Sequence, residues 1–219
     1  MNKKLVYYVA REFRRRELTK VVIVYDMDDI LWSLMTVVCQ FCDIEYARAT
    51  RIFSIRDNDQ LTHAEQTAIL DAFANPKIFE RIQFYPGAAD IMRPAELGAI
   101  IKINSNAFTS QIANLKRDQL LAAIPGLHPS NIQMNIVNPS TAKHKVLDPD
   151  MTIFIDDSPH NIASSSAIIN LMPRTIGWTS HPGDIQKIAG KRIHWEDNLL
   201  AINTLIYDIT KQIIYPDAV

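Results

Sequence analysis

Three short, mostly apolar runs and one alternating run are spread along the chain, and each predicts a strand. Residues 21–25, 99–104 and 151–155 are rich in β-branched side chains, which is typical of strands buried on both faces. Residues 131–136 alternate polar and apolar side chains, which indicates a strand with one exposed face, nearer the sheet edge. Residues 174–178 are a candidate for a fifth strand. We therefore expect a sheet of at least four strands.

Between these runs, apolar residues recur at steps of three and four, which is the period of a helix. The pattern covers residues 34–44, 64–73 and 198–214, and the apolar residues of segment 5–13 can also share one helical face. Strands separated by helices predict an α/β fold with a mostly parallel sheet flanked by helices.

The stretch from residue 33 to residue 84 contains no segment that alternates like a strand. Connections within a compact domain are much shorter, so this stretch predicts a small helical subdomain inserted after the first strand. The Tyr-Pro-Gly turn at residues 85–87 returns the chain to the sheet. We therefore divide the chain into a first core part (1–32), a helical cap (33–84) and the remaining core (85–219).

Polar side chains gather where the predicted strands end. Three acids follow the first strand, a serine and an asparagine follow the second, two lysines precede the fourth, and two acids follow the fourth. These residues are Asp26, Asp28 and Asp29; Ser105 and Asn106; Lys143 and Lys145; and Asp156 and Asp157. The carboxyl ends of parallel strands open onto one edge of the sheet, so these side chains can converge. Because neighbouring carboxylates repel one another, the pattern predicts a bound metal cation.

The overall composition excludes several classes of protein. The 23 basic and 24 acidic residues give a net charge of −1, which argues against a general nucleic-acid or membrane binder. The 47% hydrophobic content is sufficient for a sizeable core. No apolar run reaches membrane-spanning length, and two cysteines make no disulfide framework, so we expect a protein of the cytoplasm.

Two local patterns each have a structural and a functional interpretation. Cys39 and Cys42 form a C-x-x-C pair, but their apolar neighbours and the lack of a second pair favour core packing over redox or metal chemistry. Residues 1–20 are rich in basic side chains. We interpret them as the solvated face of a helix in preference to a phosphate-contacting patch.

Taken together, the motifs resemble those of the haloacid dehalogenase superfamily of phosphotransferases. That superfamily has a D-x-D motif after its first strand, a serine or threonine at a strand end, a lysine before the fourth strand and an acid pair after it. The matching residues are Asp26-Met27-Asp28, Ser105, Lys143 or Lys145, and Asp156-Asp157.

A closer likeness is to the 5'(3')-deoxyribonucleotidases. These share the D-M-D start, a helical cap inserted soon after it, a Pro-Gly segment matched at residues 86–87, and an Ile-Asp-Asp-x-Pro block matched at residues 155–159. Two departures are visible. Asp29 stands where these nucleotidases usually have glycine, and Asn104 precedes Ser105 where they have Thr-Ser.

The resemblance implies a Rossmannoid core with an inserted α-helical cap, and Mg²⁺-dependent hydrolysis of a phosphomonoester. It implies that Asp26 is the nucleophile that forms an aspartyl-phosphate. Asp28 would protonate the leaving alcohol and then activate the water that hydrolyses the intermediate. Mg²⁺ would be held by Asp26, the backbone carbonyl of Asp28, and Asp156 or Asp157.

The phosphate and the rest of the substrate involve further residues by the same resemblance. Ser105 and one of Lys143 and Lys145 would bind the phosphate, with Met27 and Asn106 as additional contacts. The substrate would be a small phosphorylated molecule such as a nucleoside monophosphate. Another small organophosphate is the alternative within the enzyme class. A non-catalytic protein that contacts nucleic acid through its basic N-terminus is the alternative outside it.

Four aromatic side chains in or beside the cap are candidates to stack on a base, and core packing is the alternative interpretation of each. They are Trp32, Phe53, Phe73 and Phe79.

Overall fold

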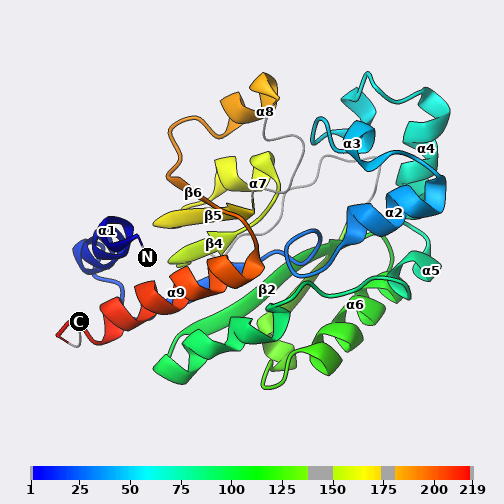
Figure 1. The fold of residues 1–219 in the computed structure, drawn as a ribbon. Helices are drawn as coiled ribbons and strands as arrows, with labels where there is room; N and C mark the ends of the chain where they lie inside the picture. The colour runs from blue at the N-terminus through cyan, green and yellow to red at the C-terminus, as the bar shows by residue number, and fades with distance from the viewer. Residues whose placement is uncertain (1, 138–149, 174–180, 218–219) are drawn as a thin grey trace.

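The apolar runs form the centre of a parallel sheet. The structure is a computed structural model that describes residues 2–137, 150–173 and 181–217. Within these residues, six strands form one sheet in the order β3-β2-β1-β4-β5-β6 (Figure 1). The strands are β1 (Val22–Tyr25), β2 (Ile100–Ala107), β3 (Ile132–Ile136), β4 (Ile153–Ile155), β5 (Ile169–Pro173) and β6 (Ile193–Glu196).

Helices connect the strands and cover the sheet, as the alternation of periods predicts. The α-helices are α1 (Lys3–Arg15), α2 (Leu34–Cys42), α3 (Tyr46–Ala49), α4 (His63–Ala72), α5 (Pro76–Phe79), α6 (Ser110–Ala123), α7 (Pro159–Ser164), α8 (Pro182–Lys187) and α9 (Leu199–Ile214). The 3₁₀ helices are η1 (Ile55–Asp57), η2 (Ala88–Leu97) and η3 (Pro129–Asn131).

The sheet is buried on both faces because its strands carry apolar side chains in both directions. Ile23 and Tyr25 of β1 belong to the larger hydrophobic core, which also contains the buried face of α9. Val22 and Val24 point the other way and pack in a smaller core with Ile162 of α7. Because both faces are buried, the sequences of these strands are continuous apolar runs without a polar and apolar alternation.

The strand predictions are largely confirmed. The first, second and fourth runs form β1, β2 and β4, and the alternating run forms β3 at the edge of the sheet. β2 is longer than expected and continues to Ala107, because its last residues pair with β3. Residues 174–178, expected to form a fifth strand, lie outside the described residues; β5 ends just before them. β6 was not predicted, since its four residues are all half-buried and carry mixed polarity.

The residues from α2 to α5 form a helical segment between β1 and β2, which lies at one end of the molecule in Figure 1. Its two connections to the sheet run side by side in opposite directions. The Tyr85 N–H donates to the Leu31 carbonyl at 2.9 Å, and the Ser33 N–H donates to the Gln83 carbonyl at 3.2 Å. These bonds fix the helical segment relative to the sheet.

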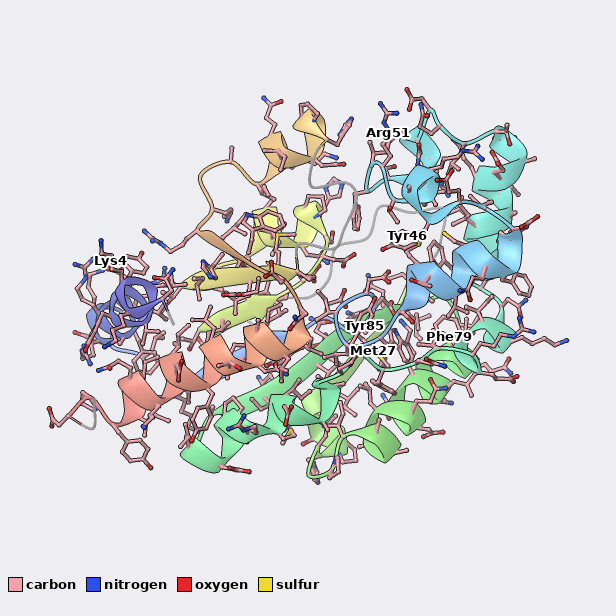
Figure 2. The ribbon with its side chains drawn as sticks, viewed as in Figure 1. Lys4, Met27, Tyr46, Arg51, Phe79 and Tyr85 are labelled. Atoms are coloured by element: carbon pink, nitrogen blue, oxygen red, sulfur yellow. The ribbon has the colours of Figure 1, made fainter. Side chains whose placement is uncertain are left out.

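The basic residues near the N-terminus lie on the solvated face of a helix, as we expected. Leu5, Val6, Val9 and Phe13 of α1 are buried, and α1 contacts α9. The basic side chains are exposed, and Figure 2 shows Lys4 far from the helical segment. No helix among the described residues is long and apolar enough to cross a membrane.

The placement of the two cysteines agrees with the expected core packing. Cys39 is buried on α2, and Cys42 is partly buried. Burial raises the pKa of the Cys39 thiol to about 12 and also raises the pKa of Cys42. Reactive cysteines need a lowered pKa, so these thiols are poor nucleophiles.

Candidate active site

The ends of β1 and β4 bring three carboxylates together. β1 lies between β2 and β4 in register, with Tyr25 opposite Ile155, so the residues that follow these two also face each other. The backbone N–H of Asp26 donates to the Ile155 carbonyl at 2.7 Å. One carboxylate oxygen from each of Asp26, Asp156 and Asp157 lies within 4.8 Å of the other two. The sequence prediction that the two acid clusters converge is consistent with this placement.

Asp156 is held rigidly in this cluster. It is fully buried, and its Oδ1 accepts a hydrogen bond from the Ser158 N–H at 2.7 Å. The Asn161 side-chain amide donates to Oδ1 at 3.1 Å and to Oδ2 at 3.0 Å. Ser158 also caps α7, in which Pro159 occupies the first turn. The Asp-Asp-Ser-Pro sequence thus forms a turn that fixes one carboxylate.

Asp28 points into a different environment from Asp26. The N–H groups of Ile30 and Leu31 donate to the Met27 carbonyl, which closes a tight turn after β1. Oδ1 of Asp28 accepts from the Trp32 indole N–H at 2.8 Å, and Oδ2 accepts from the Lys116 ammonium at 2.6 Å. The Asp28 carboxylate is therefore outside the three-carboxylate cluster, and any contact with a metal would be made by its backbone.

Lys116 is the site residue that the sequence analysis did not identify. It lies on α6 with only 1% of its surface exposed, and it also donates to Ser105 Oγ at 3.1 Å and to the Asn106 carbonyl at 2.7 Å. A signal was present in the sequence. Lys116 lies midway between Ile112 and Leu120 at four-residue steps, which places it on the buried face of the helix.

The remaining predicted phosphate contacts are placed as follows. Lys143 and Lys145 lie outside the described residues. Asn106 lines the cavity described below, whereas Ser105 is fully buried behind it and contacts Lys116. The Met27 side chain is fully buried in the hydrophobic core, so only its backbone is available to a ligand. The phosphate roles of these residues stay predictions.

Asp29 has a backbone conformation that glycine adopts more readily than aspartate. Its φ is +56°, in the left-handed region that glycine adopts without strain. Both of its carboxylate oxygens accept from the Met35 N–H in the first turn of α2, at 3.0 and 3.2 Å. Burial raises the pKa of Asp29 to about 8, against the lowering effect of the Met35 N–H, and the charges of Asp28 and Asp26 raise it further.

A cavity of about 540 Å³ opens over these residues. We call the part lined by carboxylates and the Lys116 ammonium its inner end. The remaining lining, which is mostly apolar, comes largely from the helical segment and includes Arg56, is called its outer end. Among the lining residues of the outer end are Leu34, Met35, Tyr46, Ile52, Phe53, Ile55, Leu70, Phe73, Phe79 and Phe108. Tyr46 of α3 and Phe79 of α5 mark two of these positions in Figure 2.

The four aromatic candidates separate into two groups. Phe53, Phe73 and Phe79 line the cavity, with Phe73 in contact with Phe108 at 5.9 Å between ring centroids. Trp32 is fully buried and is not among the described residues that line the cavity. For Trp32 the core-packing interpretation is therefore correct, and its indole N–H serves Asp28.

The donor set suits a hard divalent cation. Three carboxylates offer oxygen ligands only, which is the chemistry that Mg²⁺ and Ca²⁺ prefer over softer metals. Asp26 is 4% exposed and Asp156 is fully buried, so their mutual repulsion is weakly screened. A bound cation is the physical means by which the three can remain ionised together.

Comparison with known proteins supports the fold. No protein-family model and no curated protein matches the sequence. Among solved structures, a protein from Bacteroides vulgatus assigned as a beta-phosphoglucomutase is 12% identical, with a TM-score of 0.55, and the match covers 97% of this chain and 99% of that one. A haloacid dehalogenase-like family hydrolase from Streptococcus pneumoniae is 14% identical, with a TM-score of 0.52, and the match covers 86% of this chain and 98% of that one.

A third solved structure, from Burkholderia xenovorans and assigned as a haloacid dehalogenase-like hydrolase, is 13% identical, with a TM-score of 0.51 and coverage of 87% and 98%. At these identities the likeness concerns the fold alone. The predicted fold class is confirmed, while the closer likeness to deoxyribonucleotidases stays a prediction. The chain has the Rossmannoid fold of the haloacid dehalogenase-like hydrolases.

Proposed function

We propose that this protein is a Mg²⁺-dependent phosphomonoester hydrolase that acts through an aspartyl-phosphate. The observation that carries the proposal is the cluster of Asp26, Asp156 and Asp157 beside a cavity in a fold of this type. A cation at this cluster supplies charge neutralisation, which lets an anionic phosphate approach an anionic nucleophile.

In the proposed reaction, an oxygen of Asp26 attacks phosphorus and the bond from phosphorus to the leaving oxygen breaks. Asp28 enters this reaction in its protonated form and gives that proton to the leaving oxygen. It then takes a proton from the water that hydrolyses the aspartyl-phosphate, which restores the protonated form. Asp28 suits this role because it lines the cavity and its side chain is 24% exposed, whereas Asp26 is nearly buried. Asp156 and Asp157 would hold the cation together with Asp26.

The phosphate would be bound by Asn106, the backbone at Met27, and Lys143 or Lys145. The Ser105 hydroxyl keeps a phosphate role from the resemblance alone, since it is fully buried and its Oγ accepts from Lys116. Asn106 is supported by its position on the cavity wall. A further cationic phosphate ligand is proposed because the described cavity lining carries four acids, Asp26, Asp28, Asp29 and Asp157, and two cations, Lys116 and Arg56.

The leaving group would occupy the outer end of the cavity. We propose residues 33–84 as a cap that selects it, since most of the apolar lining comes from them. Phe53 and Phe73 are flat apolar walls of the kind that a nucleobase contacts, which supports a nucleoside monophosphate as the substrate. Other small organophosphates with an apolar organic part fit the same lining.

The test is phosphate release from a panel of nucleoside monophosphates, sugar phosphates and simple aryl phosphates, each with Mg²⁺ and with chelator. We expect turnover only with Mg²⁺, and we expect Asp26→Asn to abolish it, because an amide is a poor nucleophile. Asp118→Asn is the matched control, since Asp118 is exposed on α6. Undiminished turnover in chelator or in Asp26→Asn contradicts the proposal, and release from no substrate favours the non-catalytic alternative.

A further inference from the structure

We propose that Lys116 is a positioning residue for the acid–base carboxylate of Asp28, with Trp32 as its partner in that task. This inference rests on the proposed function. It gives Lys116 a role distinct from that of a phosphate-binding lysine, and it assigns that role to a helix that carries none of the sequence motifs.

The three N–H donors of the Lys116 ammonium are all accounted for. They go to Asp28 Oδ2 at 2.6 Å, Ser105 Oγ at 3.1 Å and the Asn106 carbonyl at 2.7 Å. An ammonium carries three donors, so this arrangement leaves no N–H for a phosphate oxygen. Lys116 therefore acts on the substrate through Asp28 and leaves direct phosphate contact to other groups.

The burial of Lys116 shows that its position is tightly defined. A buried cation is stable only when it is paired and hydrogen-bonded, and Lys116 meets both conditions. Two partners lie on β2, which is fixed by pairing on both sides. The rings of Trp32 and Phe79 stand over the ammonium, with centroids 5.8 and 5.5 Å from Nζ. The position of the positive charge is thus set by β2, by Asp28 after β1 and by the two rings.

Asp28 is in turn held from two sides. Lys116 donates to one carboxylate oxygen and the Trp32 indole N–H donates to the other, at 2.6 and 2.8 Å. These donors come from α6 and from the turn after β1, so rotation of the carboxylate would break at least one of the bonds. General acid catalysis requires the proton to lie within hydrogen-bond reach of the leaving oxygen. A carboxylate fixed in this way is already oriented before the substrate binds.

The consequence depends on the leaving group. An alkyl phosphate releases an alkoxide unless Asp28 protonates the leaving oxygen as the bond to phosphorus breaks. A p-nitrophenyl phosphate releases a stable anion and needs little help from a proton donor. A residue that positions Asp28 therefore matters for the first ester much more than for the second, whereas a residue that only supports the fold affects both alike.

The experiment compares kcat/KM of Lys116→Met on an alkyl phosphate that the parent hydrolyses and on p-nitrophenyl phosphate. This ratio covers the steps up to departure of the leaving group. We expect a loss of about 100-fold or more on the alkyl ester, in the range that general acid catalysis contributes, and a loss of less than about 10-fold on the aryl ester. In an Asp28→Asn background, Lys116→Met should cause little further loss on the alkyl ester.

Gln119→Ala is the matched control. Gln119 lies on the same helix and donates to the Phe79 carbonyl at 2.7 Å, so its loss disturbs the contact between α6 and the helical segment. We expect it to change both kcat/KM values by the same factor. Lys116→Arg, which retains the charge but moves the donors, serves if the methionine variant fails to fold, and it should show the same selective loss.

The outcomes are distinguishable. A parent that hydrolyses neither ester refutes the proposed function. An active parent whose Lys116 variants lose the two activities equally overturns the positioning role, as does a further full loss in the Asp28→Asn background.

Discussion

The two acid clusters at the edge of the sheet look alike in sequence, but the structure treats their carboxylates differently. After β4, Asp156 accepts hydrogen bonds from residues that closely follow it in the chain, Ser158 and Asn161. After β1, Asp29 accepts from Met35, six residues further on, and Asp28 accepts from Trp32, four residues further on, but Asp28 also accepts from Lys116 of α6, 88 residues away. The second cluster is organised by neighbours in the chain, whereas the first also depends, at Asp28, on a lysine from a distant helix.

The difference shows how several acids can occupy one site. Asp26 joins Asp156 and Asp157, where a cation can balance the three charges. Asp28 is balanced by Lys116. Asp29 accepts from a backbone N–H, and burial raises its pKa to about 8. The negative charge of each carboxylate in the first cluster can therefore be balanced in a different way: by a cation at Asp26, by the ion pair with Lys116 at Asp28, and by retention of the proton at Asp29.

The largest expected effect concerns Asp29. The pKa of its carboxyl is about 8 in the folded protein and about 3.9 in an unfolded chain. Between these values the folded state holds a proton that the unfolded state has lost, so this group lowers the stability as pH rises through that window. Each pH unit contributes at most about 1.4 kcal/mol. An asparagine side chain does not titrate, and asparagine tolerates the left-handed conformation.

We therefore expect Asp29→Asn to gain stability over the parent as pH rises from 5 to 8, by up to about 4 kcal/mol across the three units. The measurement is urea unfolding of both proteins in chelator at four pH values. Asp43→Asn is the control, because Asp43 also has a positive φ, of 53°, but is exposed. A difference between Asp29→Asn and parent that is constant with pH would contradict this account of the first cluster.

The contrast between the clusters also explains how much was predictable. Buried parallel strands carry apolar runs that are visible without any partner, so β1, β2 and β4 were found, and the acids at the ends of β1 and β4 followed. Once these strands are parallel, the meeting of Asp26 with Asp156 is a matter of topology. β6 carries no such run, since His194 and Glu196 give it a polar side and all four residues are half-buried.

What was missed depends on contacts between distant segments. Lys116 has the spacing of a buried helical position, but charge alone assigns a lysine to the surface. Its partners, Asp28 and Ser105, are 88 and 11 residues away in the chain. No local pattern reports such pairings. Trp32 differs, because its partner Asp28 is only four residues away: its ring is core, as one of its two interpretations predicts, and its indole N–H donates to Asp28.

A smaller effect is expected at Asp26, the residue that the two clusters share. Asp26→Asn removes one charge from the three-carboxylate cluster at nearly constant volume, so the metal-free variant should melt at a higher temperature than the metal-free parent. Mg²⁺ at a hundredfold excess over its dissociation constant should stabilise the parent by about 2.7 kcal/mol and the variant by less. Four thermal melts decide the matter: each protein in chelator and in excess Mg²⁺. If Mg²⁺ shifts neither protein, the cluster is not a metal site.

The smallest expected effect concerns Asn161, which orients Asp156 within the second cluster through its side-chain amide, at 3.0 and 3.1 Å from the two carboxylate oxygens. Asn161→Ala removes this amide and retains the Ser158 N–H, so Asp156 should spend less time in the orientation that binds the cation. Loss of such an outer partner typically lowers metal affinity by about 10- to 100-fold. We expect the Mg²⁺ concentration for half-maximal activity to rise by this factor, with a smaller change at saturating Mg²⁺.

Two matched variants sharpen this last test. Ser164→Ala lies on the same helix, and the Ser164 hydroxyl donates to the His160 carbonyl at 3.0 Å, away from Asp156, so this change should leave the Mg²⁺ requirement unaltered. Trp32→Phe removes a hydrogen bond from Asp28 instead of Asp156. If the clusters divide their tasks as described, Trp32→Phe lowers activity without moving the Mg²⁺ midpoint, and Asn161→Ala moves the midpoint. An equal shift of the Mg²⁺ midpoint in both variants would show that the two clusters act as one unit. A change next to Asp28 would then alter metal binding by Asp26, Asp156 and Asp157.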